Sequence, residues 1–122
     1  MKLQVQNQEL RFRIDEAELA VLLDGGEVTN TTVLGDGIAF RQSLRLHIDV
    51  KPMFDAGADG WRLLLPEVAV LEHVRQLPSK QGLIFEFERE SAATLTVRFD
   101  VDVRDSIQHR GVTKRRTAEA SS

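Results

Sequence analysis

The stretch IAFRQSLRLHIDVK, residues 38–51, decides the fold class of this chain. Apolar residues stand at alternate positions along it, and charged, polar or small residues stand between them. A period of two is typical of a half-buried β-strand, because successive side chains point to opposite faces of a sheet. Gln42 interrupts the apolar set, which predicts a β-bulge at Gln42–Ser43, and Pro52 cannot donate to a strand ladder. We therefore predict one long, bent strand that ends before Pro52.

The residues before this strand predict a hairpin, a short helix and a further strand. Asp15 and Glu18, three residues apart, form a capping-box pair that marks the helix start. Gly25-Gly26 supplies the left-handed stop at the other end. The predicted elements are a strand at 2–6, a strand at 9–14, a helix from Asp15 to Gly25, and a strand at 27–34 that a Gly-Asp-Gly turn joins to the long strand.

The residues after the long strand predict a second helix and a closing hairpin. The predicted elements are a loop at 53–60, a strand at 61–65, a helix from Pro66 to Gln76, and two strands at 83–90 and 94–104. The resulting order is ββαβββαββ. Because the strands are joined mainly as hairpins, we predict an α+β fold with a curved, mostly antiparallel sheet packed against two short helices.

Composition indicates an ordinary globular protein. The chain has 122 residues, of which 42% are hydrophobic and 29% charged, so we expect one α+β domain over 1–105 and a basic, disordered tail over 106–122. There is no cysteine and no long apolar run, which suits a cytoplasmic protein without a membrane partner. The net charge of −3 argues against a nucleic-acid partner, apart from weak contacts by the basic tail.

The polar faces of the predicted strands are heavily charged. In one interpretation they are solvated and their opposite charges pair across neighbouring strands. In the other, the faces curl inward, and their arginines bind phosphate while their carboxylates hold a divalent metal. The candidate ligand-binding residues are Arg11, Arg13, Arg45, His47, Glu86 and Glu88.

One short string supports the second interpretation. Glu86-Phe87-Glu88-Arg89-Glu90 resembles the Glu-x-Glu-x-Lys strand of the triphosphate tunnel enzymes, in which alternate carboxylates coordinate a metal. Here Glu90 stands in place of the lysine, and the string lies near the C-terminus. His47, His73 and His109 lack a metal-ligand spacing, so we expect surface histidines, no metal centre and no cofactor.

The opening KLQVQNQELRFRIDEAELAVLLDGGEVTNTTVLGDG, residues 2–37, resembles the start of a family of short, uncharacterised bacterial proteins, a domain of unknown function. The shared features are the Leu-Arg-x-Arg hairpin, the acidic helix start, the Gly-Gly stop and the Thr-rich strand. The likeness fades in the last third, where family members carry a Glu-Lys-Asp-Phe strand in place of FEFERES. The resemblance implies a soluble bacterial domain and no particular activity.

The sequence therefore predicts a small binding or assembly module without catalysis. Long alternating strands leave sheet edges to protect, and pairing of those edges in a homodimer is one solution. The alternative is a metal-dependent domain that binds or hydrolyses phosphate or triphosphate on a charged sheet face.

Overall fold

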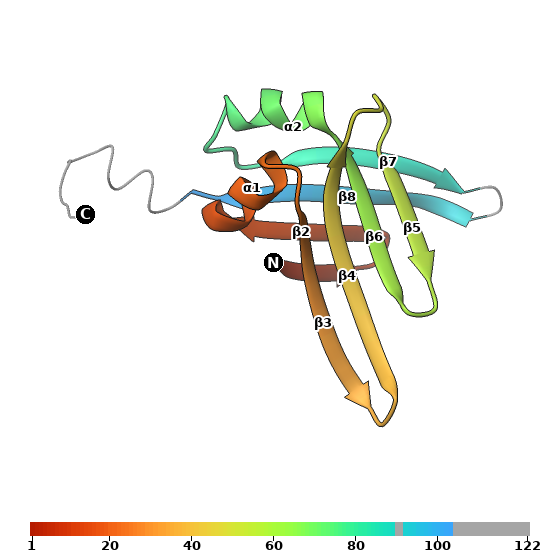
Figure 1. Ribbon diagram of the computed structural model, residues 1–122. Helices are drawn as coiled ribbons and strands as arrows, with labels where there is room; N and C mark the ends of the chain where they lie inside the picture. The colour runs from red at the N-terminus through yellow and green to blue at the C-terminus, as the bar shows by residue number, and fades with distance from the viewer. Residues whose placement is uncertain (90–91, 104–122) are drawn as a thin grey trace.

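The structure is a computed structural model that describes residues 1–89 and 92–103. Within these ranges it contains eight strands and two short helices (Figure 1). In chain order they are β1 (Lys2–Gln6), β2 (Glu9–Asp15), α1 (Glu16–Leu23), β3 (Glu27–Gly35), β4 (Ile38–His47), β5 (Met53–Gly57), β6 (Gly60–Pro66), α2 (Glu67–Val74), β7 (Leu83–Arg89) and β8 (Ala92–Asp102).

The strands form two four-stranded sheets that pack face to face. Sheet A has the order β1-β2-β8-β7 and sheet B the order β3-β4-β6-β5, and their strands run across one another (Figure 1). Each sheet consists of two antiparallel hairpins joined by a parallel pair in the middle, β2 with β8 and β4 with β6. The predicted α+β class, with two short helices and mostly antiparallel strands, is confirmed.

The two sheets arise from a repeated ββαββ unit. The first half runs from β1 to β4 and the second from β5 to β8, and each half contributes one hairpin to each sheet. Asp15 faces Asp102 at the end of one parallel pair, and Pro66 faces His47 at the end of the other. Asp15 therefore matches Pro66, and Asp102 matches His47. From these end points the two halves can be aligned position by position. Identical amino acids are almost absent from matched positions, which explains why the sequence reveals no repeat.

The match between the halves extends to single hydrogen bonds. The amide of Thr96 donates to the carbonyl of Gln8 over 2.9 Å, and the matched amide of Arg41 donates to the carbonyl of Asp59 over 3.0 Å. In both cases the turn of a two-residue hairpin loop is joined to the neighbouring parallel strand. The hairpins of the two halves are therefore docked in the same way.

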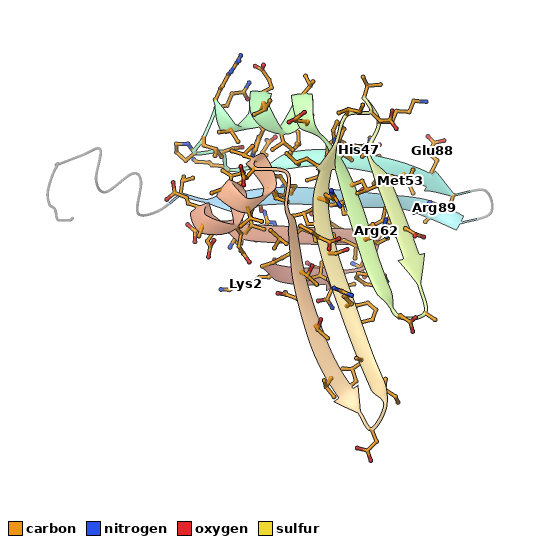
Figure 2. All side chains as sticks on the ribbon, in the orientation of Figure 1. Lys2, His47, Met53, Arg62, Glu88 and Arg89 are labelled. Carbon is orange, nitrogen blue, oxygen red and sulfur yellow. The ribbon has the colours of Figure 1, made fainter. Side chains whose placement is uncertain are left out.

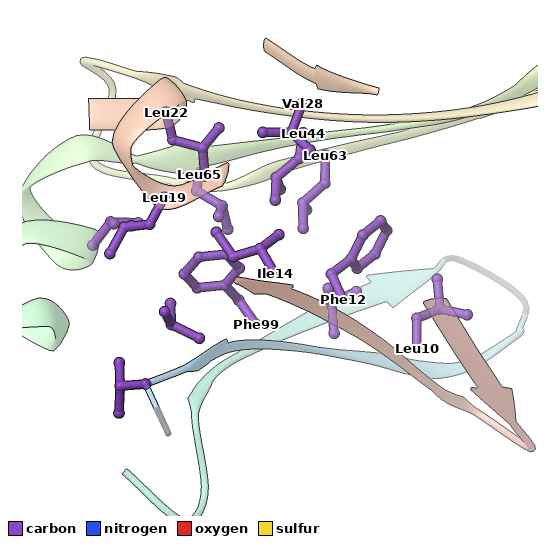
Figure 3. Close-up of a cluster of buried hydrophobic side chains, with 14 residues drawn as sticks. Leu10, Phe12, Ile14, Leu19, Leu22, Val28, Leu44, Leu63, Leu65 and Phe99 are labelled. Atoms are coloured by element: carbon purple, nitrogen blue, oxygen red, sulfur yellow. The ribbon is translucent and has the colours of Figure 1, made fainter. Parts of the chain in front are cut away.

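The hydrophobic core lies between the sheets, centred on the two parallel pairs (Figure 3). Phe12 and Phe99 are opposite one another in sheet A, and Leu44 and Leu63 hold the matched places in sheet B. All four are fully buried. The helices add further buried apolar side chains at the ends of the sheets, which are Leu19, Leu22 and Val70.

The start of α1 follows the prediction closely. The Asp15 side chain accepts from the amide of Glu18 over 2.8 Å, and the Glu18 side chain accepts from the amide of Asp15 over 3.1 Å. This capping box satisfies two backbone donors that have no partner inside the helix. The helix α2 begins after Pro66, whose side chain makes no cap hydrogen bond.

Three local predictions for the middle of the chain are wrong. Residues 53–57, predicted as a loop, form β5, because the two-residue turn at 58–59 folds them back onto β6. The long strand ends at His47, since its neighbour β6 ends at the facing Pro66. Beyond that point Ile48 is 89% exposed.

The third wrong prediction is the bulge at Gln42–Ser43. The pairing of β4 with both neighbours is continuous there, and the register shift lies between Val33 and Gly35 of β3. Gln42 is instead a buried polar residue on the inner face of β4, in line with Leu44.

None of the helices in the described ranges is both long and apolar enough to cross a membrane. The predicted basic tail, 106–122, lies outside the described residues, as does His109.

Candidate functional site

The six predicted ligand-binding residues do not form one site. Arg11 and Arg13 of β2 and Glu86 and Glu88 of β7 lie on the outer face of sheet A, and Arg45 and His47 of β4 lie on the outer face of sheet B. The core separates these two faces. Figure 2 shows His47 on sheet B and Glu88 on β7.

The outer face of sheet A is a network of paired charges. Arg98 Nε lies 3.0 Å from Glu9 Oε2, and Arg11 Nε lies 2.7 Å from Asp100 Oδ2. The more exposed Arg13 lies 3.9 Å from the same Asp100 oxygen. Here the arrangement agrees with the interpretation of a polar face whose opposite charges pair across strands.

Asp100 is the most buried of these charged residues, with 7% of its surface exposed. Its two oxygens and Arg11 Nε are buried without hydrogen-bond partners in the described part of the chain, so the 2.7 Å contact is an ion pair with poor hydrogen-bond geometry. Asp100 also lies directly over Gly82, where a Cβ would fall 1.9 Å from Asp100 Oδ1. Only a residue without a side chain fits beneath this carboxylate.

His73 is buried, and the prediction that it is a surface residue is wrong. It takes the place in α2 that Leu22 takes in α1, and its ring lies 6.5 Å from that of Phe99. Its Nε2 has no hydrogen-bond partner among the described residues. It lines a hollow of about 430 Å³ between α2 and residues 79–83, together with Glu72 and Lys80. Burial lowers the pKa of His73, and the nearby Asp100 carboxylate opposes this shift.

The lowered pKa predicts acid sensitivity. The unfolded chain binds a proton on His73 more readily than the folded chain, so the stability contributed by the neutral ring is complete above pH 6.5 and is lost as the pH falls below that value. Denaturant unfolding at pH 7.5 and 5.5, followed by the fluorescence of Trp61, should show a lower free energy of unfolding at pH 5.5. His73→Leu, which copies Leu22 of the matched helix, should weaken this pH dependence.

His47→Gln is the matched control for this experiment. The ring of His47 is partly exposed and its Nε2 lies 2.7 Å from the carbonyl oxygen of Lys51. This variant controls for the loss of a histidine that lies outside the core. An unchanged pH dependence in His73→Leu would contradict the assignment to His73.

Within the described residues, the outer face of sheet B carries arginines without carboxylate partners. Arg41 and Arg45 flank Ser43 on β4, and Arg62 of β6 is the direct neighbour of Ser43. Among the described residues, none of these arginines has a carboxylate oxygen within 4.0 Å. A hollow of about 470 Å³ lies on this face, lined by Arg41, Ser43 and Arg62, with Glu27, Asp55 and Asp59 also contributing.

The structure gathers no metal ligands in the ranges it describes. No group of three or more His, Cys, Asp or Glu side chains that could hold a metal ion occurs there. Glu86 and Glu88 are exposed on the edge strand β7, and the two sheets do not close into a tunnel. The described part of the chain therefore provides no set of metal ligands for the alternative of a metal-dependent, phosphate-binding domain.

The hairpin β3–β4 is a second functional candidate, which sequence reasoning missed. It extends beyond the other strands of both sheets (Figure 1). Near its tip Val33, Leu34 and Ile38 are 76%, 67% and 59% exposed. The strand β3 is also a sheet edge, and residues 28–34 along it contain no charge. The uncharged run at 28–34 is the feature of the sequence that could have predicted an unprotected edge strand.

Comparison with known proteins adds no constraint on this arrangement. No protein-family model and no curated protein matches the chain. The resemblance of residues 2–37 to short bacterial proteins stays a prediction.

Proposed function

We propose that this chain is a cytoplasmic binding or assembly module without catalysis, which forms a homodimer through the edge strand β3. The observation that carries the proposal is the uncharged edge at 28–34, on a hairpin with exposed apolar residues near its tip. An unpaired strand presents free N–H and C=O groups, and a second copy of the same edge can complete them. The lack of cysteine supports a reducing compartment.

The second half of the molecule provides an internal comparison. The strand β7 corresponds to β3 and is also an edge, yet it carries Glu86, Glu88 and Arg89. Charged side chains on an edge strand disfavour pairing with another chain. Of these two matched edges, β7 is protected by charge and β3 is not, which favours association through β3 over β7.

The exposed apolar residues near the hairpin tip would strengthen such a contact. Burying a Val, Leu or Ile side chain completely contributes about 1.5–3 kcal/mol. Val33, Leu34 and Ile38 of each copy are already partly buried. The free energy gained by burying the rest of these six side chains is similar in size to the free-energy cost of association, which is about 4–15 kcal/mol. We therefore expect a weak dimer that dissociates on dilution.

Sedimentation velocity over a range of concentrations tests this proposal. The wild type should shift from monomer to dimer as concentration rises. Val33→Lys should raise the dimer dissociation constant at least tenfold, because a lysine at the edge brings two like charges together and must be desolvated.

Glu88→Lys is the control, since Glu88 holds the corresponding place near the tip of the other hairpin. It should leave the dissociation constant within about twofold of the wild type, as expected for a residue outside the interface. A wild-type monomer at every concentration would refute the proposal. An equal effect of both lysines would show that β3 is not the interface.

A further inference from the structure

The two halves of the molecule differ in the connection that leads from each helix to the following edge strand. In the first half, α1 ends at Leu23 and β3 begins at Glu27, so that only the tight turn 24–26 lies between them. In the second half, the longer loop 75–82 separates α2 from β7 (Figure 1). This loop forms one wall of the hollow of about 430 Å³, and α2 forms the other.

Hydrogen bonds hold the loop 75–82 in a defined shape. The Ser79 hydroxyl accepts from the amide of Gly82 over 3.1 Å, and Arg98 Nη1 donates to the carbonyl of Gln81 over 2.9 Å. Because Arg98 belongs to β8, the second bond ties the loop to sheet A. This wall of the hollow is therefore built before any ligand arrives, which lowers the entropy cost of binding.

A buried polar side chain forms part of the other wall. His73 lines the hollow and is 6% exposed, and its Nε2 has no hydrogen-bond partner among the described residues. A buried polar atom without a partner is unfavourable, and Leu22 shows that an apolar residue fits the matched position of α1. Burial lowers the pKa of His73 and so favours the neutral ring, which offers one donor and one acceptor nitrogen. These are properties of a residue that binds a polar ligand.

The charged side chains that line the hollow are one of each sign. They are Glu72 on α2 and Lys80 on the loop, and the other polar lining residues near them are neutral. Glu72 lies 3.7 Å from Arg75, but both side chains are largely exposed, and such pairs are weak in water. Lys80 has no carboxylate oxygen within 4.0 Å in the described part of the chain. A ligand that carries both charges therefore complements the hollow better than an anion or a cation.

We propose that this hollow binds an α-amino acid in its zwitterionic form. Lys80 pairs with the carboxylate of the ligand, Glu72 pairs with its ammonium group, and the neutral ring of His73 supplies a hydrogen bond from the wall of α2. Ala69 and Leu83 provide apolar contacts for the carbon atoms. The volume lies within the usual range of small-molecule sites, about 300–1,000 Å³. The proposal involves binding only and does not depend on the dimer, whose edge β3 belongs to the other sheet.

Calorimetric titration of the full chain with the common L-amino acids tests the proposal. At least one of them should bind with a dissociation constant in the millimolar range or lower. Two derivatives of that amino acid then test the recognition of each charge, since its C-terminal amide lacks the carboxylate and its N-acetyl form lacks the ammonium group. Each derivative should bind more weakly by about tenfold or more, because it loses one of two charge-assisted contacts.

Two variants assign each charge to its residue. Lys80→Gln should make the free amino acid and its C-terminal amide bind equally, and Glu72→Gln should do the same for the free amino acid and its N-acetyl form. Both residues are exposed, so both variants should keep the melting temperature of the free protein. Lys51→Gln and Glu67→Gln are the charge-matched controls, because these exposed residues lie outside the lining of the hollow, and they should bind as the wild type does.

His73→Leu tests the buried residue, since it introduces the leucine of the matched helix. It should weaken binding of the free amino acid by about tenfold or more, while the fluorescence of Trp61 reports that the variant is folded. Undiminished binding in His73→Leu would contradict the proposal.

Three further results would overturn the proposal. They are the absence of amino-acid binding at millimolar concentration, equal binding of the free amino acid and both derivatives by the wild type, and an equal loss of binding in Lys51→Gln and Lys80→Gln. None of them bears on the dimer, which is measured separately through Val33→Lys.

Discussion

Phe99→Ala is expected to lower the free energy of unfolding by about 3–5 kcal/mol, the usual cost of removing a fully buried phenylalanine. Phe99 is 0% exposed and stands opposite Phe12 in the parallel pair at the middle of sheet A. It faces the core between the two sheets, so the cavity left by alanine would be enclosed on all sides (Figure 3). Denaturant unfolding followed by Trp61, the single tryptophan, measures the loss.

Two companion variants keep this test informative if Phe99→Ala does not fold. Phe99→Leu introduces the residue that Leu44 supplies at the matched position of sheet B, and it should cost less than the alanine variant. Phe87→Ala removes a partly buried ring that contacts Phe54 near the end of β7, and it should cost about 1–2 kcal/mol. A larger loss from Phe87→Ala than from Phe99→Ala would contradict the assignment of the core.

Gly60→Ala is expected to destabilise the protein by about 2–6 kcal/mol, combining backbone strain and overpacking of about 1–3 kcal/mol each. Gly60 has a φ of +154°, which side-chain-bearing residues rarely adopt. A Cβ there would lie 1.8 Å from the carbonyl oxygen of Arg41. That atom belongs to the backbone of the neighbouring strand β4 and cannot move aside as a flexible side chain would.

Gly37→Ala separates these two costs. Gly37 also has a positive φ, of +70°, but nothing lies within 4 Å of a Cβ built on it. Gly37→Ala should therefore lower the free energy of unfolding only through backbone strain, by about 1 kcal/mol, in the same measurement. Equal losses in the two variants would show that the close approach of β6 to β4 has little energetic weight.

Phe99→Ala and Gly60→Ala test the same feature of the fold, which is the docking of one half of the chain onto the other. The pairs β2–β8 and β4–β6 each join a strand of the first half to a strand of the second. Differences in burial and surface charge between the halves then come from single replacements at matched positions. His73 of α2 stands where α1 has Leu22, and Arg45 of β4 stands where β8 has Asp100. The charged edge strand β7 stands where β3 has its uncharged residues 28–34.

Much of the local structure could be read from the residues themselves. Alternation placed Leu44 and Leu46 on one face of β4 and Arg45 and His47 on the other, and Asp15 and Glu18 located the start of α1. Side-chain direction in a strand and capping at a helix end depend on neighbours within a few residues, so these features are encoded locally. They were sufficient to predict an α+β fold with two short helices.

The division into two sheets was decided by tertiary structure alone. Strand β2 pairs with β8, and Arg11 with Asp100, across most of the chain length, and nothing in the alternation of either strand specifies its partner. The burial of His73 has the same origin, since it depends on Phe99 lying beneath α2. A strand pattern records which face is apolar, whereas strand partners and buried charges follow from which distant segments dock together.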